Sequence, residues 1–587
     1  MGDAWDEETI LTVRKYALQN ALEYDGAGQI GSTLGRLLAE RQDLRSRAKE
    51  LSSVVNDEVT KANSLIHSEG AASVRTLIEN IDPEAVQRTK QTKREGLKPL
   101  DNISAGVVLR FAPNPNGPLS IGHARGVVIN HEYASMHDGK MVLRFDDTDT
   151  IVKPPLKDAY EWIIEDYEWL TGSKPDIVVR ASERMPVYIR YAEEMLRKSA
   201  GYVCECSAEE FRALRVSKRA CPHRGRTVEE NIEAWEKMLD GRFSPGDAVV
   251  RVLTDMSLPN PALRDWPAWR IQHEAHPMVG NSYLAWPLLD FQSAIEDHEQ
   301  GVTHIIRGKD LMDSTRKQKL LYDHLGWKYP ETLYWGRVSI HGSGSFSTSE
   351  IRRGIENKVY SGWDDPRVPT LRSMRRKGFD PAALRSFWVD MGVTQKDVAV
   401  AMESIEASNA ASIDSTSRRI SLVSDSANIA IQGEVPREIM LPFHPDDEKA
   451  GMREVSLASR AVIVEKDDVT NSFRLKGLAN IESVEGIFEI GSVERDDDRP
   501  IIHWLSPDSS VTCELLMADG DELNVMSCLV EDADLEIGEV VQLERKGFAR
   551  VEDWSPGSRK LLWLSQIGPN QHNASADSSR VQVGELS

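Results

Sequence analysis

The segment LRFAPNPNGPLSIGHARG, residues 109–126, combines residue types that suit a phosphate-binding loop. It follows an apolar run and leads into a helical pattern. It therefore ends at a helix N-terminus, whose free N–H groups and positive dipole end favour anions. Gly117 and Gly122 would let the backbone approach a ligand closely, and three prolines reduce the entropy lost on ordering. His123, in the first helical turn, could donate a hydrogen bond to a phosphate. The pattern favours nucleotide binding. A structural turn stays open, because such loops also occur without ligands.

Three of the five cysteines, with one histidine, form two close pairs that could hold a metal ion. The pairs are Cys204-Glu-Cys206 and Cys221-Pro-His223, separated by a charged helical stretch. This is a recognisable zinc arrangement for a small segment without much core of its own, although a turn stabilised by these side chains is equally open. The odd cysteine count, without an export signal, argues against a disulfide framework. Cys513 and Cys528 are expected to be core residues.

The charge of the chain is unevenly distributed. Its net charge of -22 weakens a nucleic-acid hypothesis, because phosphate binding is largely electrostatic. Residues 352–377 nevertheless carry a local charge of +5, with eight basic and three acidic side chains. One local surface could therefore attract a polyanion. A solvated helix face is the alternative interpretation.

Length and hydropathy limit the class of protein. At 587 residues the chain should hold several domains. No run of 18 apolar residues occurs, and the N-terminus is acidic where a signal peptide would be basic and then apolar. We therefore expect a cytoplasmic protein without a membrane partner, and nothing in the sequence suggests more than a monomer.

The elements that must position these residues change along the chain. Residues 1–86 have helical periodicity, and GAGQIG at 26–31 follows a helical pattern, which predicts a helix–helix turn rather than a dinucleotide site. Short apolar runs alternate with helices over 103–200 and 281–340, which predicts a Rossmann-like α/β domain. The irregular section 201–280 would be an insertion that splits this domain.

The last part of the chain has a different pattern. Residues 341–427 are largely helical and would connect the α/β domain to the C-terminal region. Residues 428–567 are strand-like, with turns every 8 to 12 residues, and predict antiparallel barrels. The polar segment 568–587 is expected to be a flexible tail.

The same motifs carry a family resemblance. PNPNGPLSIGHARG resembles the HIGH signature of class I aminoacyl-tRNA synthetases, in the form found in glutamyl- and glutaminyl-tRNA synthetases. SFSTSEIRRGI, residues 345–355, is similar to their second signature, KMSKS. Further matching segments are LRFDDTD, GVTHIIRGKDL, WDDPRVPTLRSMRRKG and LERKGFARVED. The likeness runs in order from about residue 8 to 566, and it is greatest to the archaeal glutamyl enzymes.

The resemblance implies a reaction and its partners. ATP and Mg²⁺ would serve the attachment of glutamate to tRNA(Glu) through a glutamyl-adenylate, and tRNA(Gln) could also be charged with glutamate. The section 201–280 would bind the acceptor stem, and 428–567 the anticodon. One alternative within the class is a glutaminyl-tRNA synthetase, although GVTHIIRGKDL favours the glutamyl enzyme. Another is a non-catalytic tRNA-binding protein.

The resemblance also implies roles for individual residues. ATP would be bound by Pro113, Asn114, Pro115, Asn116, Gly117, Pro118, Gly122 and His123. The catalytic positions would be Ser120, Gly122, His123, Ser347, Thr348 and Ser349. Glutamate would be bound by Arg110, Asp146 and Arg307, with Arg307 reading the side-chain carboxylate. Transfer RNA would contact Arg352, Arg353, Arg372, Arg375, Arg376 and Lys377. Some glutamyl enzymes hold zinc at a site similar to that of Cys204, Cys206, Cys221 and His223.

Several positions depart from the family pattern. The first histidine of HIGH is Ser120, which keeps a hydrogen-bonding group at the helix start. The two lysines of KMSKS are Ser345 and Thr348, so the charge that would neutralise pyrophosphate is missing there. Arg352 or Arg353 could supply it instead.

Overall fold

The computed structural model describes residues 5–24, 26–41, 44, 47–82, 96–341, 347–495 and 497–566. Ser345 and the predicted tail 568–587 lie outside these residues. The chain forms two compact units, residues 1–95 and 96–587. None of the described helices is both long and apolar enough to cross a membrane.

The first unit is helical. Its helices are α1 (Glu7–Glu23), α2 (Ile30–Glu40) and α3 (Ala48–Ile81). Asp6 caps α1 by accepting a hydrogen bond from the Thr9 N–H, and apolar residues of α1 and α3 share one core. As predicted, GAGQIG lies at a helix–helix turn: residues 26–29 connect α1 to α2, and Ile30 begins α2. Asn63 of α3 bonds both the N–H and the carbonyl of Gly28, at 2.8 and 3.0 Å, and so fixes this turn.

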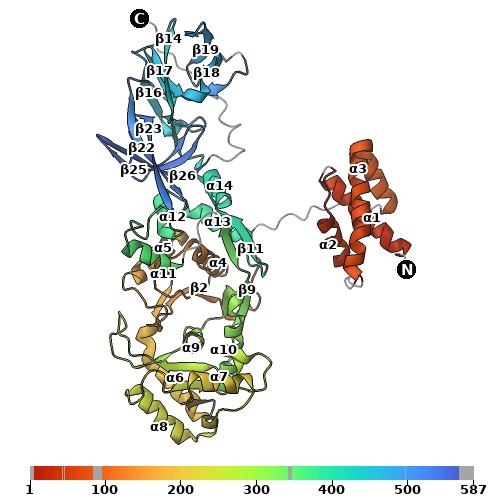
Figure 1. Ribbon diagram of the computed structural model, residues 1–587, viewed down its shortest axis with the longest axis vertical. Helices are drawn as coiled ribbons and strands as arrows, with labels where there is room; N and C mark the ends of the chain where they lie inside the picture. Colours follow the sequence, from red (N-terminus) through yellow and green to blue (C-terminus); the bar gives the residue numbers. More distant parts are fainter. Residues whose placement is uncertain are drawn as a thin grey trace. The chain divides into compact units, whose positions relative to one another are not determined.

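The second unit begins with a parallel α/β domain (Figure 1). Its strands β1 (Val108–Phe111), β2 (Lys140–Phe145) and β3 (Ile177–Arg180) pair in that order, and α4 (Ile121–Met136) and α5 (Ala159–Thr171) connect them. β8 (His304–Gly308) pairs with β9 (Glu331–Trp335) in parallel, and α10 (Met312–Leu325) joins these two strands. The Thr303 N–H donates to the Val108 carbonyl at 3.0 Å, so β8 starts beside β1. A long segment of the chain, between β3 and β8, therefore separates the two parts of this domain in the sequence.

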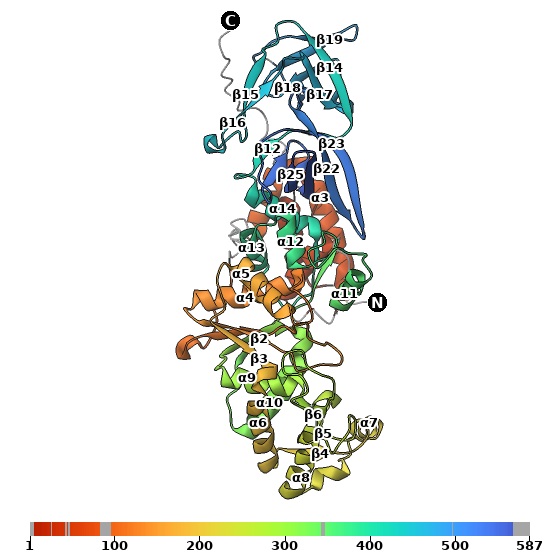
Figure 2. The same ribbon diagram turned by 90° about the vertical axis from the view of Figure 1, so that its left-hand side faces the viewer.

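The segment between β3 and β8 is an insertion with its own antiparallel sheet (Figure 2). The sheet contains β4 (Gly201–Cys204), β5 (Val249–Val252), β6 (Pro267–Ile271) and β7 (Ala285–Pro287). The helices near it are α6 (Met185–Arg197), α7 (Ala208–Val216), α8 (Val228–Leu239) and α9 (Leu289–Glu299). Its core is aromatic, with the Trp235 and Trp269 rings 4.9 Å apart. Because β7 pairs with β6, the expected boundary at residue 280 falls inside this sheet.

A helical connector comes next. It consists of β10 (Val338–His341), α11 (Thr348–Glu356), α12 (Leu371–Lys377), α13 (Pro381–Met391), β11 (Val398–Ala401) and α14 (Met402–Ile413). Trp388 of α13 and Ala410 of α14 belong to the same hydrophobic core as residues of α4 and α5. Phe548 and Leu564, from the C-terminal strands, join this core as well. The connector is therefore packed on both of its neighbours.

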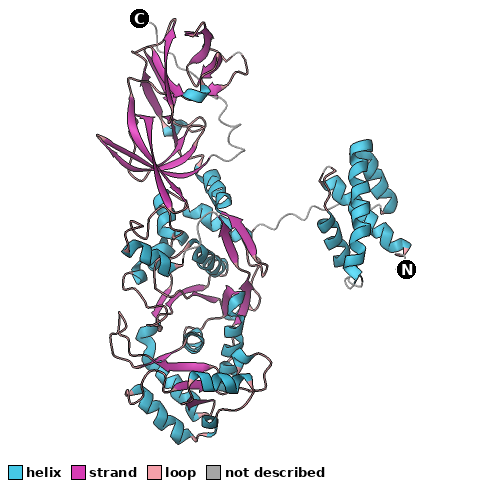
Figure 3. Ribbon diagram, viewed as in Figure 1, coloured by secondary structure: helices cyan, strands magenta, loops and turns pink. Residues whose placement is uncertain are grey.

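The C-terminal part consists almost entirely of strands (Figure 3). One sheet has the order β12-β24-β25-β26-β22-β23-β13, and a second has the order β17-β14-β20-β19-β18-β21. The first sheet contains β12 (Arg418–Ile420), β13 (Leu422–Val423), β22 (Ser510–Asp519), β23 (Glu522–Glu531), β24 (Val540–Leu543), β25 (Gly547–Ser555) and β26 (Ser558–Gln566). A separate pair is formed by β15 (Glu438–Pro442) and β16 (Met452–Ser456). The second sheet contains β14 (Ser426–Gln432), β17 (Ala461–Glu465), β18 (Ser472–Leu475), β19 (Ala479–Val484), β20 (Ile487–Ile490) and β21 (Ile501–Ile502).

The ends of the first sheet show that it closes. β12 and β13 occupy its two edges, yet only Ser421 separates them in the chain. The two edges must therefore meet, and the sheet is a barrel. Contrary to the prediction, it is not purely antiparallel, because β12 pairs with β24 and β22 pairs with β26 in parallel. The fold as a whole is a helical N-terminal domain, a split α/β domain, a helical connector and C-terminal β-barrels.

Candidate active site

The loop after β1 ends in a defined geometry at the start of α4. Ser120 is the N-cap, and its N–H donates to Nδ1 of His123 at 3.1 Å. Because a backbone N–H can only donate, Nδ1 is the acceptor, and the neutral ring carries its proton on Nε2. Desolvation by surrounding protein atoms lowers the pKa of His123, and the positive charge of Lys153 lowers it further. His123 is therefore a neutral hydrogen-bond donor near pH 7, beside the N–H groups of the helix start.

The two expected signature segments meet at Gly117. A Cβ atom added there would lie 2.5 Å from Cγ2 of Thr348 and 3.2 Å from the Trp363 ring, so only glycine fits this contact. Thr348 opens α11, and Ser347 caps that helix through a reciprocal bond pair with Glu350. The Ser347 and Ser349 hydroxyl oxygens are 3.1 Å apart. Residues 347–349 thus lie beside the loop expected to hold ATP.

The loop is also tied to the end of β2. Asn114 donates through Nδ2 to the Asp146 carbonyl at 3.0 Å, and the Asp146 N–H donates to the Pro113 carbonyl at 3.0 Å. The buried Oδ1 atom of Asn114 has no hydrogen-bond partner among the described residues. The expected ATP-binding and glutamate-binding residues therefore lie together at the carboxyl edge of the sheet, where parallel α/β sheets bind ligands.

A buried ion network joins two of the three expected glutamate-binding residues, Arg110 and Asp146. Asp297 of α9 is 1% exposed, and its Oδ1 accepts from Nε of Arg110 at 3.3 Å and from Nη1 of Arg144 at 2.7 Å. Arg144 also donates through Nε to Oδ1 of Asp146 at 2.7 Å, and Gln292 donates to the same oxygen at 3.0 Å. Arg144, Gln292 and Asp297 were missed by the sequence analysis. Arg144 alone had a signal, because it lies two residues before Asp146 on one face of a strand.

Arg307 is bound differently from the other two arginines. It is 6% exposed, and its Nη2 atom contacts three neutral groups: Thr315 Oγ1 at 2.5 Å, Tyr329 OH at 2.9 Å and Gln318 Oε1 at 3.0 Å. Its buried Nε has no hydrogen-bond partner, and no carboxylate of a described residue lies within ion-pair distance. A buried charge is costly unless an anion compensates it. This arginine is thus oriented and left available for an anionic ligand.

The local charge balance agrees with an anionic ligand at Arg307. Burial lowers the pKa of Arg110, and the positive charges of Arg144 and Arg307 add to this effect against the opposing charge of Asp297. Three buried arginines therefore face two carboxylates, those of Asp146 and Asp297. An incoming carboxylate would balance the excess charge.

The cysteine and histidine side chains converge as their spacing predicts. Cys204 ends β4, Cys206 lies just before α7, and Cys221 and His223 lie in the turn that follows α7. Their four ligand atoms lie within 4.8 Å of one another. Cys221 Sγ is 3.5 Å from Cys204 Sγ, 3.4 Å from Cys206 Sγ and 3.4 Å from His223 Nδ1. These separations are close to the ~3.6–3.8 Å between neighbouring ligand atoms of a tetrahedral zinc ion.

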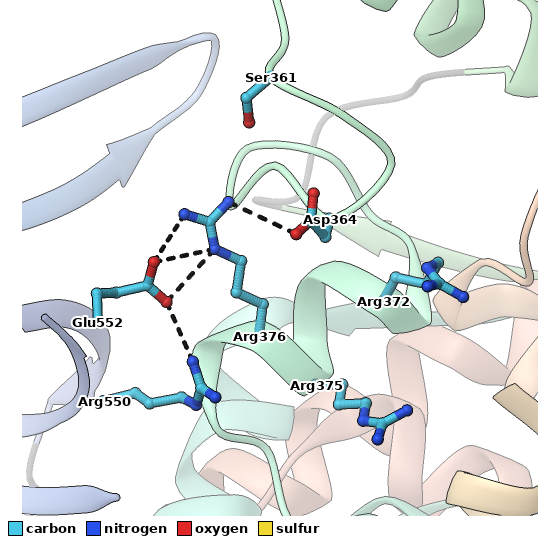
Figure 4. Close-up of a pocket in the computed structure, with 7 residues that line it drawn as sticks. All are labelled: Ser361, Asp364, Arg372, Arg375, Arg376, Arg550 and Glu552. Atoms are coloured by element: carbon cyan, nitrogen blue, oxygen red, sulfur yellow. Dashed lines mark hydrogen bonds and ion pairs between the residues drawn. The ribbon is translucent and has the colours of Figure 1, made fainter. Parts of the chain in front are cut away.

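Three of the six arginine and lysine residues expected to bind tRNA line one hollow of about 760 Å³ (Figure 4). These are Arg372, Arg375 and Arg376 of α12, and the lining also includes Ser361, Asp364, Arg550 and Glu552. Glu552 binds Arg376 at 2.7 Å and Arg550 at 3.1 Å, so the hollow joins the connector to the first barrel. Arg372 pairs with Glu165 of α5 at 2.7 Å. Four guanidinium groups line the hollow against the carboxylates of Asp364 and Glu552, and the balance stays positive when Glu165 is counted as well.

The other three residues lie elsewhere. Arg352 and Arg353 are on α11, and Arg352 pairs with Glu356 at 3.0 Å. Burial lowers the pKa of Lys377, and the charge of Glu406 partly opposes that shift. None of the three lines the hollow.

Removing the carboxylate of Asp297 should destabilise the second unit, because it leaves Arg110 and Arg144 buried without it. Burial raises the pKa of Asp297, but the charges of Arg110 and Arg144 outweigh this and lower it. The ionised carboxylate therefore adds stability above its unfolded pKa of about 4, and this is lost as pH falls through the folded pKa. Asp297→Asn should cost about 3–5 kcal/mol at pH 7, measured by urea denaturation. The deficit should shrink as the pH is lowered below 4.

A matched control is Glu233→Gln, which breaks an exposed pair with Lys237 on α8 and should change stability little. Equal unfolding midpoints for Asp297→Asn and the wild type at pH 7 would show that the network does not support the fold.

Comparison with known proteins covers most of the chain. The family model "tRNA synthetases class I (E and Q), catalytic domain" matches residues 106–415, and two anti-codon binding domain models of that family match 417–495 and 501–552. A protein named glutamate--tRNA ligase from Methanothrix thermoacetophila is 43% identical over 93% of this chain and 97% of its own. The one from Thermococcus kodakarensis is 41% identical, over 94% and 98%.

A crystal structure of glutamate-tRNA synthetase from Elizabethkingia anophelis is similar to 53% of this chain and 71% of its own, at 22% identity and a TM-score of 0.39. That likeness is too slight to assign a family, whereas the family models and the sequence relatives cover nearly every domain described above. By these matches, this chain belongs to the class I tRNA synthetases of the E and Q family.

Proposed function

We propose that this protein is a glutamate–tRNA ligase that uses ATP. In the first step the α-carboxylate of glutamate attacks the α-phosphorus of ATP, and pyrophosphate leaves. In the second step the terminal adenosine of tRNA takes the glutamyl group from the adenylate, and AMP leaves. The observation that carries the choice of glutamate is Arg307, buried, held by neutral groups and without a carboxylate partner among the described residues. The names of the relatives agree with it.

Neither step needs a nucleophile from the enzyme, so positioning and charge stabilisation should do most of the work. The proposal assigns the phosphates of ATP to residues 113–118 and to the N-terminus of α4. His123 would donate through Nε2 to an α-phosphate oxygen as negative charge develops. Mg²⁺ would be held mainly by the oxygens of the nucleotide. Residues 347–349 would approach the same phosphates from the second signature segment, with hydroxyl groups in place of lysine.

The choice between glutamate and glutamine rests on the same arginine. A carboxylate can accept two parallel hydrogen bonds from a guanidinium group and balance its charge, whereas a carboxamide cannot balance it. In the proposed pose, Arg307 binds the side-chain carboxylate, Arg110 lies beside it, and Asp146 receives the α-ammonium group. A glutaminyl enzyme would more naturally surround its amide with neutral groups alone.

Transfer RNA would extend from the insertion to the barrels. The positive hollow of Arg372, Arg375, Arg376 and Arg550 suits the phosphate backbone, which positions an RNA without reading its sequence. The barrels can present loops and side chains to unstacked anticodon bases. We propose tRNA(Glu) as the substrate and tRNA(Gln) as a further acceptor to be tested with it.

For the cluster of Cys204, Cys206, Cys221 and His223, we propose a structural zinc ion. The support is the convergence of four soft ligands from two separate segments onto one point. The small apolar cluster around Tyr202 and Phe211 is next to it, and a metal would fix the turn that carries Cys221. A structural ion would leave no open position for chemistry.

The direct test is aminoacylation by the purified protein, with labelled glutamate and glutamine in parallel and separate tRNA(Glu) and tRNA(Gln). We expect glutamate transfer to tRNA(Glu), and transfer to both tRNAs would establish the wider specificity. Transfer of glutamine would instead select the glutaminyl alternative. Binding of tRNA without transfer of either amino acid would favour the non-catalytic alternative.

Arg307→Ala should raise the KM for glutamate by about a hundredfold, because it removes a buried charge-assisted contact. Residual use of glutamine should change much less, since the amide never balanced that charge. Steady-state aminoacylation with each amino acid measures both effects. Arg316→Ala is the matched control, because Arg316 forms an exposed pair with Asp313 on the neighbouring helix α10. An equal loss for the two amino acids would contradict the role given to Arg307.

Purified protein should contain one zinc ion per chain by atomic emission, and Cys206→Ser should lose it and unfold at a lower temperature. Cys513→Ser, a change to a buried cysteine in the barrel, should keep the metal. A metal content near zero in wild-type protein purified without chelators would count against the zinc site.

A further inference from the structure

A buried carboxylate from a neighbouring helix holds the backbone of the expected phosphate-binding loop. Asp166 of α5 is 2% exposed, and its Oδ2 accepts a hydrogen bond from the Leu119 N–H at 2.9 Å. Its neighbours on the same face of α5, Ile163, Tyr167 and Leu170, belong to the hydrophobic core. Burying a carboxylic acid among apolar side chains costs free energy unless the group is hydrogen-bonded. The bond it makes lies one residue before the cap of α4.

The connector holds the other side of the same short segment. The Leu371 N–H donates to the Leu119 carbonyl at 2.8 Å, and the Ile121 N–H donates to the Pro369 carbonyl at 3.1 Å. Ser120 and Thr370 therefore face each other in a short antiparallel bridge. This bridge leaves the Leu119 N–H to Asp166. Residues 119–121 are therefore hydrogen-bonded to α5 on one side and to the connector on the other.

The two sets of bonds fix the two peptide planes that flank Leu119. The bond that Leu119 donates to Asp166 fixes the plane that contains the Leu119 N–H. The bond from Leu371 fixes the next plane, which contains the Leu119 carbonyl and the Ser120 N–H. That N–H in turn holds His123 through Nδ1 at 3.1 Å and so orients Nε2. A rotation of the first peptide plane would therefore also reorient the start of α4 and the His123 ring.

We propose that Asp166 is a positioning residue for this loop. Through Leu119 it holds Ser120 and His123 in the orientation that binds the phosphates of ATP. The inference rests on the proposed function, because it takes the ligand of the loop to be ATP. Asp166 acts as a hydrogen-bond acceptor, and its charge is not required.

The surroundings of Asp166 agree with an acceptor that does not need its charge, because the carboxyl group is partly protonated near pH 7. Burial raises the pKa of Asp166 to about 7, against the opposing hydrogen bond from Leu119 and the charge of Arg372. Asparagine offers a similar acceptor oxygen in nearly the same shape. Leucine fills that shape and offers none. These two variants therefore separate the hydrogen bond from packing.

The experiment compares Asp166→Asn, Asp166→Leu and Asp166→Ala with the wild type. ATP affinity is measured directly by calorimetry, the KM for ATP and for glutamate by aminoacylation, and folding by thermal unfolding. Asp166→Leu and Asp166→Ala should weaken ATP binding by about tenfold or more, since small misplacements in a site can cost up to ~10²-fold. The KM for glutamate should change less than about twofold. Asp166→Asn should restore most of the ATP affinity.

Asp176→Ala is the matched control. Its Oδ2 accepts from the Met141 N–H at 2.7 Å, which is the same kind of bond at the amino end of β2, opposite the edge that carries the loop. It should lower the unfolding temperature without changing ATP affinity.

Three outcomes would overturn the inference. The first is unchanged ATP affinity in folded Asp166→Leu or Asp166→Ala. The second is an equal loss of ATP affinity in Asp176→Ala. The third is a loss in Asp166→Asn as large as that in Asp166→Leu, which would show that the charge itself is needed. If the wild type binds ATP but transfers no glutamate, the proposed function fails, and the calorimetric comparison still decides the role of Asp166.

Discussion

The constraint on which the rest of the catalytic domain depends is the buried charge of Asp297. It shares its oxygen between arginines of β1 and β2, and Arg144 passes the connection to Asp146. Two consecutive strands and the distant helix α9 must therefore meet at one edge of the sheet. The insertion between β3 and β8 must therefore bring α9 back to this edge of the sheet, whatever the shape of the rest of the insertion. The same network explains how several guanidinium groups can lie buried together, since each charge is compensated or awaits an anionic ligand.

A second set of contacts joins the site to the rest of the unit. The expected phosphate-binding loop is hydrogen-bonded to the connector through residues 369–371, and α12, which begins at Leu371, carries the arginines of the positive hollow. The Arg376–Glu552 pair continues from α12 to the first barrel. The helix that would contact the RNA backbone therefore begins at the segment whose backbone is hydrogen-bonded to the loop that would hold the nucleotide. These hydrogen bonds and ion pairs act together with the shared hydrophobic core, to which α12 contributes Leu371 and Met374.

Sequence reasoning predicted the features that depend on local pattern. The loop before α4, the βαβ unit, the convergence of two Cys/His pairs and the strand-rich C-terminal part all follow from spacing and periodicity. It could not find Asp297 or Asp166, because each lies in an ordinary helical stretch and acts on a partner far away in the chain. The expected boundary at residue 280 misses β7, a three-residue strand whose pairing with β6 is decided by tertiary contacts. The specificity argument for Arg307 likewise needed its neutral neighbours Thr315, Gln318 and Tyr329 to be seen together.

The single residue between β12 and β13 has a consequence for the order in which the chain can fold during synthesis. Those two strands lie at residues 418–423, but their partners β23 and β24 lie at 522–531 and 540–543. All strands of the second sheet, residues 426–502, emerge between them. The second sheet can therefore complete its pairings while the first barrel is still open, with two short strands waiting for partners. Such long-range closure is slow compared with local pairing. The barrel that packs on the catalytic domain is thus the last of the two to close, and until then its strand edges stay unpaired and open to pairing with other chains.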